Sequence, residues 1–161
     1  MKKWKKIVIK FPILFLIIPI VSCTNEVREM KDKSFFEGQY NIFADEFFVK
    51  SEKEYFVYYY SLMCPPCQDL KEEMENFIKE SDIKVYTLSL QNMNDDEIDL
   101  FKERDENMSN EEMREAMLGC EKLSGVYLVG TPTLYKINQK DSTHYLEDVI
   151  LGYSKIINFI K

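Results

Sequence analysis

The residues of this chain with the clearest capacity for chemistry are its cysteines. The chain has 161 residues with four cysteines and a single histidine, so few side chains are available for metal or histidine-based chemistry. Two of the cysteines form the motif Cys64-Pro65-Pro66-Cys67. On a helix this spacing places the second thiol one turn beyond the first, within reach of a disulfide. The motif therefore predicts thiol–disulfide exchange.

The segments on either side of this motif predict how the two thiols are positioned. Residues 55–60 form a run of β-forming residues, typical of a strand buried on both faces. After the motif comes an amphipathic helix, whose apolar positions are Leu70, Met74, Phe77 and Ile78. Cys64 is thus expected at a helix N-cap, where free N–H groups and the helix dipole stabilise a thiolate. We expect Cys64 to attack and Cys67 to resolve the mixed disulfide.

The two prolines between the cysteines bear on the direction of electron flow. Pro65 suits the first helical position, because its missing N–H would be unpaired there in any case. Neither Pro65 nor Pro66 can donate an N–H to a thiolate at Cys64, which leaves the Cys67 N–H and the dipole. This weaker stabilisation predicts a less oxidising disulfide than that of a Cys-Pro-His-Cys oxidase, and it favours a reductase or exchange role.

The rest of the chain predicts the order of the remaining elements. Residues 35–50 suggest a short strand and a short helix, and residues 83–90 form a second strand after the motif's helix. An antiparallel hairpin with a turn at 138–142 is expected to follow, with strands at residues 133–137 and 144–151. A final helix begins after Gly152. A parallel βαβ unit followed by ββα is the order of an α/β sandwich.

A second motif, Gly130-Thr131-Pro132-Thr133, stands just before the predicted hairpin. With both motifs in this order, the sequence resembles the thioredoxin superfamily from about Phe35 to Lys161. The resemblance implies a thioredoxin-like α/β sandwich with a mixed central sheet. It also implies a cis-proline at Pro132, with Thr131 and Pro132 as the edge that docks an extended substrate. Exchange by such a dithiol needs no bound cofactor, only a redox partner.

Two positions depart from the pattern of the cytoplasmic thioredoxins. In those proteins a buried aspartate six residues before the first cysteine assists proton transfer to the second cysteine, and here that position is Tyr58. Those proteins usually have a tryptophan just before the first cysteine, and here that position is Met63. Water or another acid such as Glu54 would have to serve Cys67 in place of the aspartate.

The N-terminal segment predicts where the protein works. Residues 1–22 combine lysines with an apolar run too short to span a bilayer comfortably, and Ile20-Val21-Ser22-Cys23 resembles a bacterial lipobox. We expect a signal peptide at 1–22, a lipidated Cys23 with a tether to residue 34, and a thioredoxin-like domain at 35–161. An uncleaved anchor and a plain signal peptide are the alternatives. The lipobox implies a protein anchored in the cell membrane and facing outward.

These features together resemble extracytoplasmic thioredoxin-like lipoproteins and bacteriocin-transport accessory proteins. Their resemblance implies that the partners are extracytoplasmic protein thiols and disulfides, together with a membrane protein that passes electrons across the bilayer. The formal net charge of −7 argues against nucleic acid as a partner. Residues 91–118 form an acidic helical insertion, with a helix predicted to start near residue 110 after a capping box at Ser109. This insertion is either a docking surface or a set of solvated helical faces.

Other functions are open to the same residues. Cys64, Cys67, Cys120 and His144 make a nominal Cys₃His zinc set, and Met63 could join the motif in binding copper. Cys120 is instead expected as a buried thiol on the apolar face of the helix that starts near residue 110, and His144 as a surface or strand-end residue. The remaining alternative is a thioredoxin-fold module that binds a partner without turnover.

Overall fold

The computed structural model describes residues 35–36 and 40–161. The signal peptide, the lipidated Cys23 and the tether predicted from the sequence lie outside the described residues. Within the described part of the chain, none of the helices has the length and apolar character required to cross a membrane.

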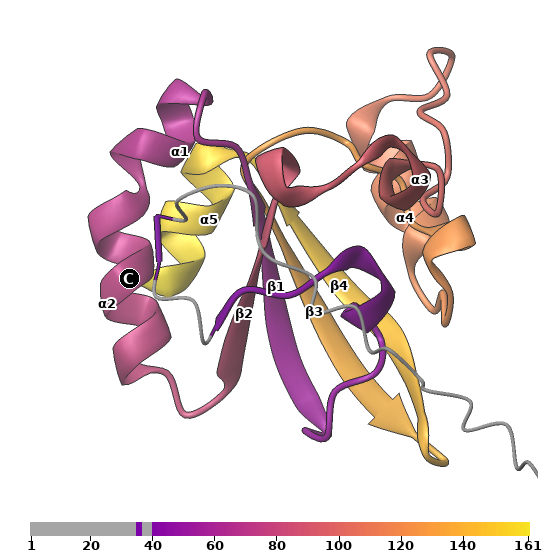
Figure 1. Cartoon of the computed structure of the whole chain (residues 1–161), viewed down its shortest axis with the longest axis horizontal. Helices are drawn as coiled ribbons and strands as arrows, with labels where there is room; N and C mark the ends of the chain where they lie inside the picture. The colour runs from indigo at the N-terminus through magenta and orange to yellow at the C-terminus, as the bar shows by residue number, and fades with distance from the viewer. Residues whose placement is uncertain (1–34, 37–39) are drawn as a thin grey trace, which may run out of the picture.

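The core of the structure is a four-stranded mixed sheet with the strand order β2-β1-β3-β4 (Figure 1). Strand β1 pairs in parallel with β2 and antiparallel with β3, and β3 continues into β4 as an antiparallel hairpin. The strands are β1 (Glu54–Tyr60), β2 (Lys84–Ser89), β3 (Thr133–Lys140) and β4 (Thr143–Leu151). This arrangement is the mixed α/β architecture that the sequence predicted.

Helices cover both faces of the sheet, as Figure 1 shows. One face carries α1 (Pro65–Asp69), α2 (Lys71–Glu80) and α5 (Tyr153–Ile160). The opposite side holds the short helix η2 (Ala44–Glu46) together with α3 (Asp95–Ile98) and α4 (Asn110–Met117). Two further 3₁₀ turns are η3 (Leu90–Asn92) and η4 (Leu123–Gly125). The sheet is therefore the middle layer of a sandwich.

Strand β1 lies at the centre of this sandwich and supplies side chains to both hydrophobic cores. Tyr55, Val57 and Tyr59 face the α4 side, and Phe56, Tyr58 and Tyr60 face α1, α2 and α5. Every one of these six residues is buried. Because successive side chains of a strand point to opposite faces, an uninterrupted apolar run requires cover on both. The prediction of a doubly buried strand is confirmed.

Three elements differ in detail from the sequence predictions. The helix expected after the cysteine motif is divided into α1 and α2 at the fully buried Leu70. The hairpin turn is only two residues long, Asp141 and Ser142, each with a positive φ. Such a turn matches the twist of the flanking strands and lets both strands extend further than expected. The short strand near residue 40 is a single bridge from Asn41 to Thr87.

The acidic insertion contains the predicted helix, but Cys120 does not belong to it. Ser109 caps α4 through the expected box with Glu112. The helix ends at Met117, and the chain turns at Gly119, whose φ is 81°. Cys120 therefore lies beyond the helix, half-buried, and its thiol donates to the Gly125 carbonyl oxygen at 3.3 Å. The expectation of a buried thiol on the helix face was wrong, because the periodicity continued past the true helix end.

Candidate functional site: a cysteine pair beside a cis-proline

The first cysteine of the motif lies where β1 gives way to α1. Cys64 is the N-cap of α1 with an extended backbone, and Pro65 and Pro66 are the first helical residues. The Cys64 sulfur accepts a hydrogen bond from the Cys67 N–H at 3.3 Å. An N-cap side chain that accepts from the first turn satisfies one of the unpaired N–H groups there. The motif thus forms the capped helix start that the sequence predicted.

The cis-proline loop approaches the same sulfur from the other side. The peptide bond between Thr131 and Pro132 is cis. The Cys64 thiol donates to the Thr131 carbonyl oxygen at 3.4 Å. The structure therefore brings together the two motifs that the sequence singled out. Beside them, the side chain of Met63 is 81% exposed, whereas Cys64 is only 9% exposed.

The second cysteine lies in the interior. Cys67 is fully buried, between α1 and the sheet. Burial raises the pKa of the Cys67 thiol to about 12, and the interaction with Cys64 adds to this rise. Contacts with the Ser61 backbone and the Thr131 side chain lower the pKa of Cys67 in part. At neutral pH the Cys67 thiol is thus protonated, and any reaction that uses its sulfur as a nucleophile must first remove that proton.

The loop that leads into Cys64 is fixed by a glutamine that sequence reasoning missed. Gln91 accepts from the Leu62 N–H at 2.9 Å and donates to the Ser61 hydroxyl at 2.7 Å. Ser61 in turn accepts from the Met63 N–H at 3.2 Å. On the other side Gln68 donates to the Leu62 carbonyl at 2.8 Å. Gln91 lies in η3, the turn that follows β2, and β2 is the parallel neighbour of β1; this adjacency is the signal that could have identified Gln91.

Glu54 cannot serve Cys67, contrary to the suggestion from the sequence. It is the first residue of β1, and the cysteine loop leaves the other end of that strand. Six steps of about 3.3 Å separate the two ends, a distance on the order of 20 Å. Glu54 instead forms an ion pair with Lys136 at 2.8 Å. The sequence could not show this, because strand direction and pairing decide where Glu54 lies.

Tyr58 occupies the place of the absent aspartate and is completely buried. Its ring stacks on Tyr60, with centroids 5.6 Å apart, and meets the ring of Phe36 edge-on. The phenol oxygen is buried and makes no well-formed hydrogen bond. Burial raises the pKa of Tyr58, and the neighbouring thiols of Cys67 and Cys64 raise it further. The phenol therefore keeps its proton throughout the neutral range.

The residues of the nominal zinc set do not form one cluster. His144 is buried in β4, where its Nε2 lies 2.9 Å from the Glu52 carbonyl oxygen and its ring packs against Tyr55. His144 lies near the end of a strand, as expected, but the expectation of a surface position was wrong, because its ring packs against Tyr55 of β1. Over residues 35–36 and 40–161, no group of three or more His, Cys, Asp or Glu side chains is arranged to hold a metal ion.

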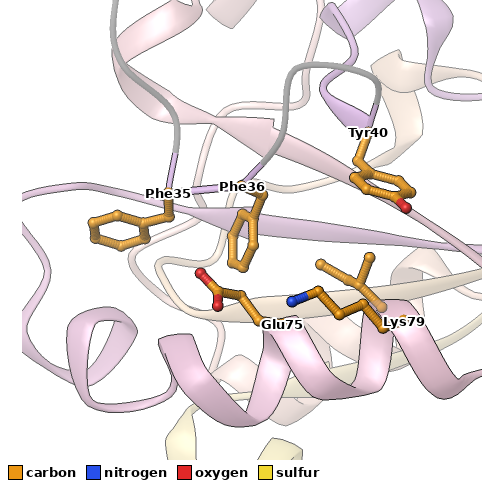
Figure 2. A pocket seen from close by; sticks show the side chains of 6 residues that line it. Phe35, Phe36, Tyr40, Glu75 and Lys79 are labelled. Atoms are coloured by element: carbon orange, nitrogen blue, oxygen red, sulfur yellow. The ribbon is translucent and has the colours of Figure 1, made fainter.

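Two surface hollows flank this region. One, of about 170 Å³, lies beside the cis-proline and is lined by Thr131, Pro132 and Gly152, with Asn110 from α4. The other lies between α2 and the segment that carries the aromatic rings of Phe35, Phe36 and Tyr40 (Figure 2). Figure 2 shows Glu75 and Lys79 on the α2 side of that hollow. Of these two hollows, only the first is lined by residues of a motif, the Gly130-Thr131-Pro132-Thr133 segment.

Two thioredoxins are among the solved structures to which this chain is similar. No protein-family model matches the chain. A thioredoxin from Trichomonas vaginalis is 15% identical, covers 66% of this chain and 76% of its own, and superposes with a TM-score of 0.42. A chloroplastic thioredoxin z is 16% identical over 74% of this chain and 88% of its own, with a TM-score of 0.41. On its own strand order, motif placement and helix layers, the chain has a thioredoxin-like α/β sandwich fold.

Proposed function

We propose that this protein is a thiol–disulfide oxidoreductase in which Cys64 is the nucleophile and Cys67 the resolving thiol. One observation carries the proposal: the Cys64 sulfur lies 3.3 Å from the Cys67 N–H and 3.4 Å from the Thr131 carbonyl. A single sulfur thus meets both the helix start that stabilises a thiolate and the backbone edge that can hold a substrate.

In the first step the Cys64 thiolate attacks one sulfur of a substrate disulfide. A mixed disulfide forms between Cys64 and the substrate, and the other substrate sulfur leaves as a thiolate that takes up a proton. The Cys67 N–H holds the attacking sulfur in place. The extended segment of the substrate pairs with the backbone of Thr131 and packs on Pro132, where the surface hollow lies. The exposed Met63 side chain adds apolar contact beside the sulfur.

In the second step Cys67 attacks the Cys64 sulfur of the mixed disulfide. The bond between Cys64 and the substrate breaks, the Cys64–Cys67 disulfide forms, and the second substrate thiolate leaves. The proton lost by Cys67 ends on that leaving thiolate. Two electrons have then passed from the cysteine pair to the substrate disulfide. Because the pKa of Cys67 is raised to about 12, the second step is the slower one at neutral pH.

Donor geometry around Cys64 favours reduction or exchange over oxidation of substrates. Two of the three residues that follow Cys64 are prolines, and the one N–H in that stretch belongs to Cys67. Fewer donors stabilise the Cys64 thiolate less, and a less stable reduced form makes a less oxidising disulfide. The preferred role is thus to pass electrons onward to disulfides of other proteins.

The cellular setting that we propose follows from the lipobox-like segment at Cys23. The domain would be anchored in the cell membrane by a lipid at Cys23, facing outward, and a membrane redox protein would reduce its disulfide again. Replacing Cys23 by Ala should leave purified exchange activity unchanged and move the chain out of the membrane fraction. A membrane fraction that holds equal amounts of both chains contradicts the anchor.

The reduction potential of the Cys64–Cys67 pair tests the redox proposal directly. The chain is equilibrated in glutathione buffers of graded ratio, and the disulfide is quantified by mass spectrometry after alkylation. A potential near or below about −220 mV supports a reductase, and one between about −180 and −120 mV supports a catalyst of disulfide formation or isomerisation. Cys67→Ser is the control, since it retains the nucleophile Cys64 but cannot form the Cys64–Cys67 disulfide. Absence of any Cys64–Cys67 disulfide at every ratio overturns the proposal.

A further inference from the structure

The buried phenol of Tyr58 has no partner within hydrogen-bonding geometry, although the sheet core around it is well packed. Its side chain is 0% exposed, and its oxygen is among the few buried side-chain polar atoms of the described residues that lack a hydrogen bond. A buried hydroxyl left without a hydrogen bond destabilises the folded state. An unpaired hydroxyl at this position is therefore explained more readily by a role in the chemistry of neighbouring groups than by stability.

The surroundings of this phenol are the two redox cysteines. Tyr58 projects from β1 to the face that α1 covers, in the same cluster as Cys64, Cys67 and Leu70. Stacking on Tyr60 and the edge contact with Phe36 fix the ring. Burial raises the pKa of the phenol, and the neighbouring Cys67 and Cys64 thiols raise it further. The hydroxyl is thus held close to the thiol that must resolve the mixed disulfide.

A protonated Cys67 accepts only a weak hydrogen bond from this hydroxyl, whereas an ionised Cys67 accepts a strong one. A neutral thiol is a weak acceptor, whereas hydrogen bonds to ionised acceptors are about twice as strong as neutral ones. An interaction that gains strength only as the reaction proceeds lowers the barrier without stabilising the resting state. The raised pKa of Tyr58 keeps the phenol protonated, so it acts as a donor and not as a base.

We propose that Tyr58 is a positioning residue that donates a hydrogen bond to the Cys67 thiolate as it forms, and thereby speeds the resolving step. This inference rests on the proposed oxidoreductase function and deepens it. The proton of Tyr58 stays on its oxygen, and the Cys67 proton leaves to the departing substrate thiolate. The bonds that form and break are those of the second step described above.

The groups that act on Cys67 come from the start of α1, from the loops at Ser61 and Thr131, and from β1. Cys64 at the start of α1 raises the pKa of Cys67, while the Ser61 backbone and the Thr131 side chain lower it. On β1, Tyr59 interacts with Cys67 from the same strand as Tyr58. In the mixed disulfide Cys64 carries no ionisable proton, so its part in raising the pKa of Cys67 is gone, whereas Ser61, Thr131 and the phenol remain.

The test separates the two steps in a single reaction. The full chain, with Cys23 and Cys120 replaced by Ser so that only the motif thiols react, is reduced and mixed with Ellman's reagent. Attack by Cys64 releases the first thionitrobenzoate, and resolution by Cys67 releases the second. The two phases are followed by absorbance over a range of pH, with Cys67→Ser marking the first phase alone.

Tyr58→Phe should leave the first phase unchanged and slow the second about tenfold or more at neutral pH, as expected for loss of a hydrogen bond to an ionised group. The rate–pH curve of the second phase should move to higher pH by about one unit, so that the two chains converge in alkali. Tyr55→Phe is the matched control: on the same strand, it loses a hydroxyl that donates to the Phe47 carbonyl at 2.9 Å, and its second phase should not change.

Three outcomes contradict the inference, each in a different way. If the second phase of Tyr58→Phe has the rate and the pH dependence of the parent chain, the phenol has no role in the resolving step. A second phase slowed equally at every pH shows that Tyr58 only supports packing. Release of one equivalent by the parent chain, with no disulfide formed, overturns the proposed function and the inference with it.

Discussion

The sulfur of Cys64 and the carbonyl oxygen of Thr131 lie 3.4 Å apart, although 67 positions separate the two residues in the chain. The sheet makes this contact, because β1 and β3 are antiparallel neighbours whose last pair joins Tyr59 to Thr133. The segment after the C-terminal end of β1, which carries Cys64, therefore lies beside the segment before the N-terminal end of β3, which carries Thr131. Any change that shifts the register of these two strands will separate the two halves of the candidate site.

Loss of the Gln91 side chain should loosen the loop before Cys64. Gln91→Ala removes hydrogen bonds to Leu62 and Ser61, and we expect a loss of about 1–3 kcal/mol in the free energy of unfolding. Alkylation of Cys64 should also become faster, since the sulfur is more accessible. Urea denaturation and iodoacetamide kinetics measure the two effects. Gln68→Ala is the control, because its one bond to Leu62 is exposed and should matter less. Equal effects of both variants would refute the special role of Gln91.

Alkylation of Cys67 should remain slow well into the alkaline range. The raised pKa of about 12 leaves little Cys67 thiolate at neutral pH, and the thiolate fraction rises with pH up to that value. In Cys64→Ser the rate should rise earlier, because Cys64 is one of the causes of the raised pKa. Peptide mapping after alkylation at graded pH measures both chains. Rapid modification of Cys67 at neutral pH in the native parent chain contradicts its burial.

Glu54→Gln should leave thiol–disulfide exchange unchanged. Glu54 pairs with Lys136 at the end of β1 remote from the cysteines, and this partly exposed pair contributes on the order of 1 kcal/mol or less to stability. Lys136 retains its second partner, Glu147, at 2.7 Å. The two phases of the Ellman reaction and a urea titration provide the measurement. A slower second phase would reinstate Glu54 as an acid for Cys67.

Gly125→Ala should destabilise the domain through a single steric contact. A Cβ at Gly125 would stand 2.5 Å from the Cys120 sulfur, and overpacking of this kind costs about 1–3 kcal/mol. Cys120→Ala removes the sulfur, so the double variant should recover most of the loss. A double-mutant cycle in urea measures the coupling. Additive losses, with no recovery in the double variant, would show that the contact with Cys120 is not the cause.

Local chemistry in the sequence was enough to predict the parts of the fold that depend on neighbouring residues. The six-residue run of β1, the capping box at Ser109 and the placement of the motif at a strand-to-helix junction all follow from side chains close in the chain. Fold class followed from the order of these elements, which restricts the strand connections to few topologies.

Features that depend on tertiary pairing could not be predicted in the same way. His144 is buried because its ring packs against Tyr55 and its Nε2 lies 2.9 Å from the Glu52 carbonyl oxygen, both far away in the sequence. Gln91 reaches the cysteine loop only because β2 lies beside β1. Helical periodicity extended to Cys120, yet Gly119 ends the pattern earlier. For His144 and Gln91 the position in space was decided by a neighbour distant in sequence.

The burial of β1 on both faces has a dynamic consequence for the cysteine pair. Amide protons in a central, doubly covered strand exchange with solvent mainly when the whole domain opens. The cysteine loop is attached directly to the end of this strand, and Cys67 packs against it. Deuterium uptake should consequently be slowest along β1 and faster in the acidic insertion. The cysteine pair is thus attached to the strand that we expect to open last, and the spacing of the two thiols should be preserved during local opening elsewhere.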